Sequence, residues 1–148
     1  MHELPRQLTV EELARLFEGR TRFVERLAAR QDPLAAAGTL AHELTEEDKL
    51  EALNAHPAIG ARALSPTSAR EQGEDADRGT SAELARLNRL YEERFGFRFV
   101  VFVDRRARAE LIPVLRERLA RSRDEELETA LDELIAIAQD RWRRRDVA

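Results

Sequence analysis

A histidine followed by proline, and a glutamate–glutamine pair further along, have the residue types and spacing that acid–base chemistry needs. His56 precedes Pro57, and proline disfavours the α conformation at the residue before it, so a helix is expected to end there. Helical periodicity resumes near Ser68, which puts Glu71 and Gln72 in a first turn, where free backbone N–H groups can receive an anion. The pattern predicts a small-molecule site between two helix ends. A connecting loop with a capping serine is the alternative.

The side chains of this stretch suit proton transfer without a cofactor. Histidine titrates near neutrality and can move a proton, and a neighbouring carboxylate can orient the ring or share the proton. Glutamine and serine can hydrogen-bond a polar heterocycle, and an arginine can bind a carboxylate through two bonds. The three histidines are far apart and show no His-x-x-x-His spacing, so a metal site has little support. No glycine-rich phosphate loop is visible.

Length and composition limit the class of protein. A chain of 148 residues is expected to form one domain, residues 1–148, with a single core. Hydrophobic residues make up 43% and charged residues 36%, and the net charge of -4 gives no general attraction to nucleic acid or anionic lipid. The absence of cysteine excludes thiol nucleophiles and suits a reducing cytoplasm. With no visible signal peptide and no apolar stretch of bilayer length, we expect a cytoplasmic protein without membrane contact.

Capping signals and apolar periodicity predict an all-α fold, a bundle of roughly seven to nine helices. Thr9 with Glu12, and Ser122 with Glu125, have the spacing of capping boxes at two helix starts. Gly19 is expected to separate or bend the first helical run. Further helices are expected within residues 34–44, 45–56, 81–96, 104–121 and 122–145.

Two stretches interrupt this helical pattern. Residues 97–103 read as a buried strand, but the chain offers no partner strand. We therefore expect an extended buried segment or the apolar start of the next helix. Residues 73–80 are polar and lack periodicity, which is typical of a mobile loop.

Two other features have structural as well as functional interpretations. His42 is interpreted as a surface or half-buried helix histidine, because nothing near it in the sequence pairs with it as a site. The basic residues 141–145 are interpreted as cations at a helix C-terminus, with nucleic-acid contact as the alternative. Because the chain is acidic overall, we expect no nucleic-acid partner.

Several motifs occur together and in order along the chain. They are His56-Pro57-Ala58-Ile59-Gly60, Ser68-x-x-Glu71-Gln72, Leu87-Asn88-x-x-Tyr91-x-x-x-Phe95-Gly96-Phe97-x-Phe99, Arg118-Leu119, Glu125-Glu126 and Ile135-x-Ile137-Ala138-x-x-Arg141. The combination, over nearly the whole chain, resembles the decarboxylase of 2-oxo-4-hydroxy-4-carboxy-5-ureidoimidazoline (OHCU decarboxylase) of the ureide pathway. Each piece alone is weak, whereas the set at these separations is specific.

The resemblance implies an all-α, usually homodimeric enzyme that needs no cofactor or metal and acts on a small ureide in urate degradation. It implies that His56 is the catalytic acid–base and that Glu71 assists it. Arg141 would bind the substrate anion. The remaining substrate-binding residues implied by the resemblance are Pro57, Ser68, Ala69, Arg70, Gln72 and the backbone of Phe99, Val100, Val101, Phe102 and Val103. Unpaired backbone N–H and C=O groups of that last segment could read a ureide.

The sequence departs from the family pattern at three places. Arg98 stands where the family commonly has proline, residues 73–80 are unusually acidic, and residues 19–23 lack the expected aromatic signature. Two alternatives therefore stay open. One is a related decarboxylase or isomerase acting on another small ureide. The other is a non-catalytic helical interaction module that uses residues 141–145 or the helix beginning near Ser81.

Overall fold

The computed structural model describes residues 7–57 and 78–145, and these two ranges contain seven α-helices and no strand. The expected all-α class is confirmed. The helices are α1 (Val10–Phe17), α2 (Arg22–Ala28), α3 (Pro33–Glu43), α4 (Glu46–Asn54), α6 (Arg78–Phe95), α7 (Arg108–Leu119) and α8 (Arg123–Arg145). None of the helices described here combines the length and the apolar character needed to cross a membrane.

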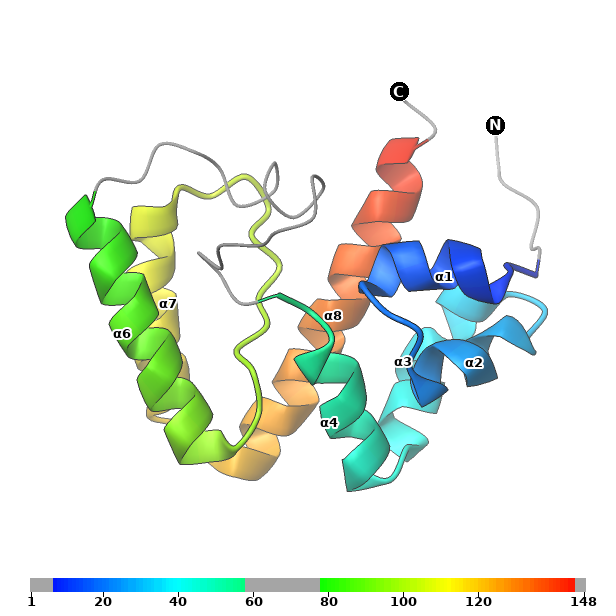
Figure 1. Ribbon diagram of the computed structural model, residues 1–148, viewed down its shortest axis with the longest axis horizontal. Helices are drawn as coiled ribbons and strands as arrows, with labels where there is room; N and C mark the ends of the chain where they lie inside the picture. Colours follow the sequence, from blue (N-terminus) through cyan, green and yellow to red (C-terminus); the bar gives the residue numbers. More distant parts are fainter. Residues whose placement is uncertain (1–6, 58–77, 146–148) are drawn as a thin grey trace.

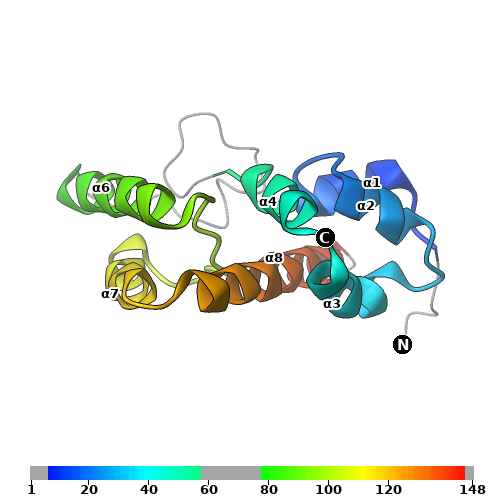
Figure 2. The same cartoon turned by 90° about the horizontal axis from the view of Figure 1, so that it is seen from below.

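Helix α8 is the central element of the arrangement. It contacts α1, α3 and α4, and Figure 1 shows it running between these helices and the α6–α7 pair. The view in Figure 2 shows the same division, with α6 and α7 at one end and α1, α2 and α3 at the other. Buried apolar side chains from all seven helices form one core cluster. Residues far apart in sequence are therefore brought together along α8.

Both ends of α1 are defined by their capping residues. The Thr9 side chain accepts a hydrogen bond from the Glu12 N–H while the Glu12 side chain accepts from the Thr9 N–H, which confirms the predicted capping box. Glu18 ends α1 in the left-handed conformation, with φ of 66°. Gly19 follows, and a Cβ there would lie 3.1 Å from the Ala55 Cβ, so the turn lies directly against the end of α4. Gly19 thus separates two helices, as predicted.

Helix α4 ends where the His–Pro pair predicts. Its last helical residue is Asn54, Ala55 is the C-cap, and the His56 N–H donates to the Leu53 carbonyl at 3.2 Å. The helix starts at Thr45, whose side chain accepts from the Asp48 N–H. His56 therefore stands just beyond a helix that is capped at its other end.

The segment of residues 97–103 is neither helix nor strand and is largely buried. The next helix begins later than predicted, at Arg108 rather than Asp104, because Asp104 and Arg105 adopt positive φ angles of 50° and 65° and form a turn. Pro113 lies inside α7. Helix α6 begins at Arg78, so the end of the predicted loop 73–80 is helical, and residues 73–77 lie outside the described residues.

Candidate active site

His56 is a buried imidazole beyond the end of α4. Its exposed fraction is 7%, and Nδ1 has no hydrogen-bond partner among the described residues. Burial lowers the pKa of His56 to about 4, with a further lowering by the Arg141 and Arg98 charges and an opposing effect from Glu18. The imidazole is therefore neutral at pH 7. A neutral ring with an unused nitrogen can accept a proton.

An arginine from α8 and a glutamate from the end of α1 form a buried ion pair that acts electrostatically on His56. Arg141 Nη2 lies 3.2 Å from Glu18 Oε1, and Arg141 Nη1 donates to the Leu16 carbonyl at 3.1 Å. The two side chains are 4% and 15% exposed. Arg141 is therefore held inside the molecule, near the C-terminal end of α8. Arg144, by contrast, pairs with Asp140 of the same helix at 2.8 Å.

Glu18 was not foreseen from the sequence. Its only signal is its place directly before Gly19, where a helix was expected to end. The left-handed conformation at Glu18 is unusual for a residue with a side chain, and such conformations gather at functional sites. Pro57, which follows His56, is half-buried. The structure thus brings two predicted site residues, His56 and Arg141, together with one that the sequence did not reveal.

The segment after α6 reaches the end of α4 through Arg98. Arg98 Nη1 donates to the His56 carbonyl at 2.7 Å, and the Arg98 N–H donates to Asn54 Oδ1 at 3.0 Å. Arg98 Nε lies 3.8 Å from Glu92 Oε1 of α6. The residue that departs from the family pattern therefore contacts the backbone of the predicted catalytic residue.

Several backbone groups of the predicted binding segment are already used within the protein. The Val100 carbonyl accepts from Arg118 at 2.8 Å, and the Phe102 N–H donates to Glu133 at 3.2 Å. Arg106 donates to the carbonyls of Phe102 and Val103. The expectation that the segment offers unpaired backbone groups is wrong for these atoms. Val101 makes no hydrogen bond within the described ranges, and Phe99 makes none there either.

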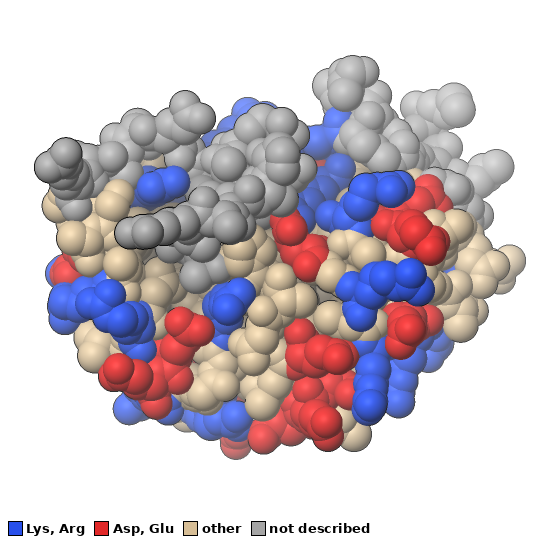
Figure 3. All heavy atoms as spheres, in the orientation of Figure 1, with Lys and Arg blue, Asp and Glu red and all other residues tan. Residues whose placement is uncertain are grey.

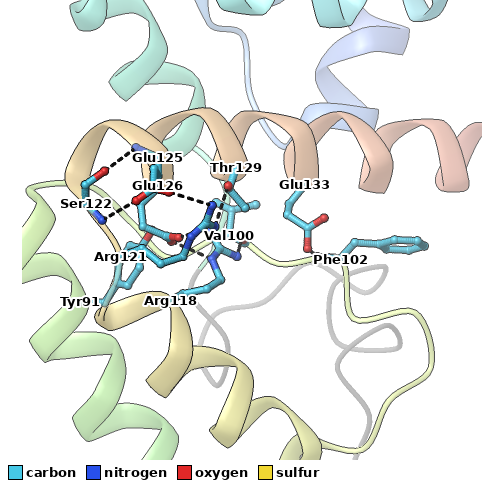
Figure 4. A network of polar contacts seen from close by, with 10 residues as sticks. All are labelled: Tyr91, Val100, Phe102, Arg118, Arg121, Ser122, Glu125, Glu126, Thr129 and Glu133. Carbon is cyan, nitrogen blue, oxygen red and sulfur yellow. Dashed lines mark hydrogen bonds and ion pairs between the residues drawn. The ribbon is translucent and has the colours of Figure 1, made fainter.

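A buried polar network holds this segment against α8 (Figure 4). Glu126, fully buried, accepts from Tyr91 Oη at 2.6 Å, from Arg118 Nε at 2.7 Å and from Arg121 Nη1 at 3.0 Å. Arg118 also lies over the Phe99 ring, 4.6 Å from its centroid. Burial and the bond to Glu126 raise the pKa of Tyr91, so its hydroxyl stays protonated. The network thus holds the segment of residues 97–103 against α7 and α8.

The remaining predicted site residues fall outside the described part of the chain. They are Glu71, Ser68, Ala69, Arg70 and Gln72. Their positions relative to His56 stay a prediction.

The other described histidine, His42, belongs to a cluster of charged side chains from α3, α4 and α8. His42 of α3 hydrogen-bonds Glu128 and, at 2.8 Å, Asp132, and Lys49 lies 3.2 Å from Glu128. His42 is half-buried, as expected, and its two carboxylate partners come from α8, which is distant from it in the sequence. Within residues 7–57 and 78–145, no three His, Cys, Asp or Glu side chains are grouped to hold a metal ion.

Comparison with known proteins assigns this arrangement to a family. The family model for OHCU decarboxylase matches residues 2–143, and the chain belongs to the OHCU decarboxylase family. It is 29% identical over 154 residues to the uric acid degradation bifunctional protein PucL of Bacillus subtilis, covering 95% of this chain and 31% of that protein. It is 33% identical over 108 residues to a 2-oxo-4-hydroxy-4-carboxy-5-ureidoimidazoline decarboxylase of Haloferax volcanii, covering 70% of this chain and 64% of that protein.

Structure comparison agrees with the family assignment. A crystal structure of an OHCU decarboxylase in the presence of (S)-allantoin superimposes with a TM-score of 0.75 at 27% identity. The match covers 88% of this chain and 94% of that one. The chain spans about one third to two thirds of the length of the curated relatives given above.

Proposed function

We propose that this protein catalyses the cofactor-free decarboxylation of 2-oxo-4-hydroxy-4-carboxy-5-ureidoimidazoline to (S)-allantoin, a step of urate degradation. The chain belongs to the OHCU decarboxylase family, and the observation that carries the proposal is the state of its His56. The imidazole is buried and neutral, its Nδ1 has no hydrogen-bond partner among the described residues, and the charges of the Arg141–Glu18 pair act on it. We further propose that the enzyme acts in the cytoplasm and that residues 1–148 form a single domain.

The substrate's own structure makes the reaction possible without a metal or prosthetic group. One ring carbon carries both the hydroxyl and the carboxylate and stands next to a C=N bond. When the bond to CO2 breaks, its electron pair forms a C=C bond to the neighbouring carbon, and the C=N pair moves onto nitrogen, which takes a proton. The product of this step is an enol. Loss of its hydroxyl proton and protonation of the adjacent carbon on one face give (S)-allantoin.

The residues divide this work according to their charge. His56, neutral at pH 7, takes or relays the hydroxyl proton, and the nearby Glu18 carboxylate favours the imidazolium that results. Arg141 binds the substrate anion, in competition with its pairing to Glu18. Glu71 assists His56. The substrate is held by Pro57, Ser68, Ala69, Arg70, Gln72 and the backbone of the segment Phe99, Val100, Val101, Phe102 and Val103.

The proposal is tested with freshly generated urate-oxidation product, following (S)-allantoin by circular dichroism. The wild-type protein is expected to accelerate formation of a single enantiomer. His56→Asn is expected to lower kcat by about 100-fold or more, the scale of general acid–base catalysis. His42→Asn is the matched control, because it removes a histidine on another face. Wild-type protein that does not accelerate the reaction would favour a non-catalytic interaction module, and an active His56→Asn variant would refute the role of His56.

A further inference from the structure

Arg98 joins three parts of the molecule at the point where α4 ends. Its backbone N–H binds the Asn54 side chain at 3.0 Å, and its Nη1 binds the His56 carbonyl at 2.7 Å. Its Nε faces Glu92 of α6 at 3.8 Å. Helix α4, helix α6 and the segment of residues 97–103 are thus connected through one side chain, which is about one third exposed.

The bond to His56 satisfies a carbonyl at the end of a helix. The His56 carbonyl lies two residues beyond the last residue of α4, and the helix dipole makes this end attractive to a cation. A charge-assisted bond of 2.7 Å there is stronger than a neutral one. Because the carbonyl and the ring belong to the same residue, fixing the carbonyl restricts the direction in which the His56 side chain leaves the backbone.

These contacts depend on the residue type at position 98. A proline at this position would lack both the backbone N–H and the guanidinium, so it could form neither hydrogen bond. The segment of residues 97–103 is therefore joined to the end of α4 by the two Arg98 hydrogen bonds.

We propose that Arg98 is a positioning residue that holds the His56–Pro57 corner against the 97–103 segment and so orients the His56 imidazole in the site. The inference rests on the proposed acid–base function of His56. Among residues 7–57 and 78–145, the charged groups that act on His56 are Arg141 from α8, Glu18 from the end of α1 and Arg98 itself. The Arg98 charge lowers the pKa of His56 in the same direction as Arg141, so removal of Arg98 changes the ring's titration as well as its orientation.

The kinetic test compares Arg98→Gln, Arg98→Lys and the control Arg94→Gln. Arg94 also donates to a backbone carbonyl, that of Arg121 at 3.1 Å, but lies outside the site. Arg98→Gln is expected to lower kcat by about 10- to 100-fold with KM little changed, as for displaced catalytic groups. Arg98→Lys keeps the charge and is expected to recover part of the loss, and Arg94→Gln is expected to match wild type. A rise in KM at unchanged kcat would overturn the proposal, because it would indicate direct substrate binding.

A second readout does not depend on activity. The His56 ring is titrated by NMR in wild type and both Arg98 variants, with circular dichroism confirming that each is folded. Arg98→Gln is expected to raise the pKa of His56, and Arg98→Lys is expected to leave it near the wild-type value. A folded Arg98→Gln variant with wild-type kcat and an unchanged His56 titration would overturn the proposal. If wild type fails to decarboxylate the substrate, the proposed function falls while this titration still decides the role of Arg98.

Discussion

At the scale of single residues, the two described histidines are tuned in opposite directions. Burial lowers the pKa of His56 to about 4, and the Arg141 charge adds to this effect. Burial acts the same way on His42, but hydrogen bonds to Asp132 and Glu128 outweigh it and raise the pKa of His42. The ordinary value of 6.5 lies between the two. Burial thus favours the neutral form of His56, whereas two carboxylates favour the charged form of His42.

The pH dependence of activity tests this tuning at His56. The acidic limb of kcat/KM reports the free enzyme's base, so it is expected near pH 4 rather than 6.5. Arg141→Gln removes a charge that lowers the pKa of His56, so its residual activity is expected to have an acidic limb at higher pH. The profiles are measured by initial rates in buffers of constant ionic strength. A wild-type limb at 6.5 would contradict the assignment of His56 as a buried base.

The pH dependence of stability tests the tuning at His42. Because its folded pKa is raised, its contribution is fully present below the unfolded pKa of 6.5 and is lost as pH rises through the folded value. We expect His42→Gln to lower the free energy of unfolding by about 0.2 to 1 kcal/mol in mildly acidic solution, as for a partly exposed ion pair. The difference should vanish in alkaline solution. Urea unfolding over a pH series measures it, and a difference that grows with pH would contradict the assignment.

At the scale of elements, polar contacts with other parts of the chain determine the backbone conformation of the irregular segment of residues 97–103. Regular helices satisfy their own backbone groups, whereas a buried segment that is neither helix nor strand must find other partners. Arg118, Arg106 and Glu133 supply them, and Glu126 holds Arg118 in place. Figure 4 shows Arg118 of α7 and Glu126 and Glu133 of α8 beside this segment. Apolar packing buries the segment, and the hydrogen bonds of this network determine its backbone conformation.

Removal of Glu126 is expected to destabilise the protein strongly. Glu126→Ala leaves Arg118, with a side chain only 7% exposed, without its carboxylate. Breaking a buried ion pair by removing one partner costs about 3 to 5 kcal/mol. Urea unfolding compares this variant with Glu93→Ala, which changes an exposed glutamate of α6. A cost as small as that of the Glu93 control would show that the network contributes little.

The features that were predicted correctly from the sequence, such as helix caps and helix ends, are those that residues close together in the chain determine. The capping boxes of Thr9 with Glu12 and Ser122 with Glu125 join residues three positions apart, and both form as predicted. The end of α4 at the His–Pro pair is equally local. By contrast, Arg141 meets the end of α1 across 125 residues, and His42 meets α8 across 86 to 90 residues. Such pairs depend on the packing of helices, which periodicity alone does not specify.

At the scale of the whole molecule, we propose that two chains associate, as the family resemblance implies. The face in Figure 3 shows Lys and Arg interspersed with Asp and Glu where it is described, without one dominant sign of charge. Light scattering after size-exclusion chromatography is expected to give twice the chain mass of 17.0 kDa. A mass of 17.0 kDa at the concentrations used for activity would show that a single chain suffices.

The central place of α8 has a consequence for how this protein is made in the cell. Chains emerge from the ribosome with the N-terminal end first, so α1, α3 and α4 are synthesised long before the helix against which they all pack. Contacts between segments so distant in sequence form slowly, because a long stretch of chain must be closed first. The faces of α1, α3 and α4 that pack on α8 therefore stay uncovered during synthesis, and Glu18 cannot pair with Arg141 until α8 has been made.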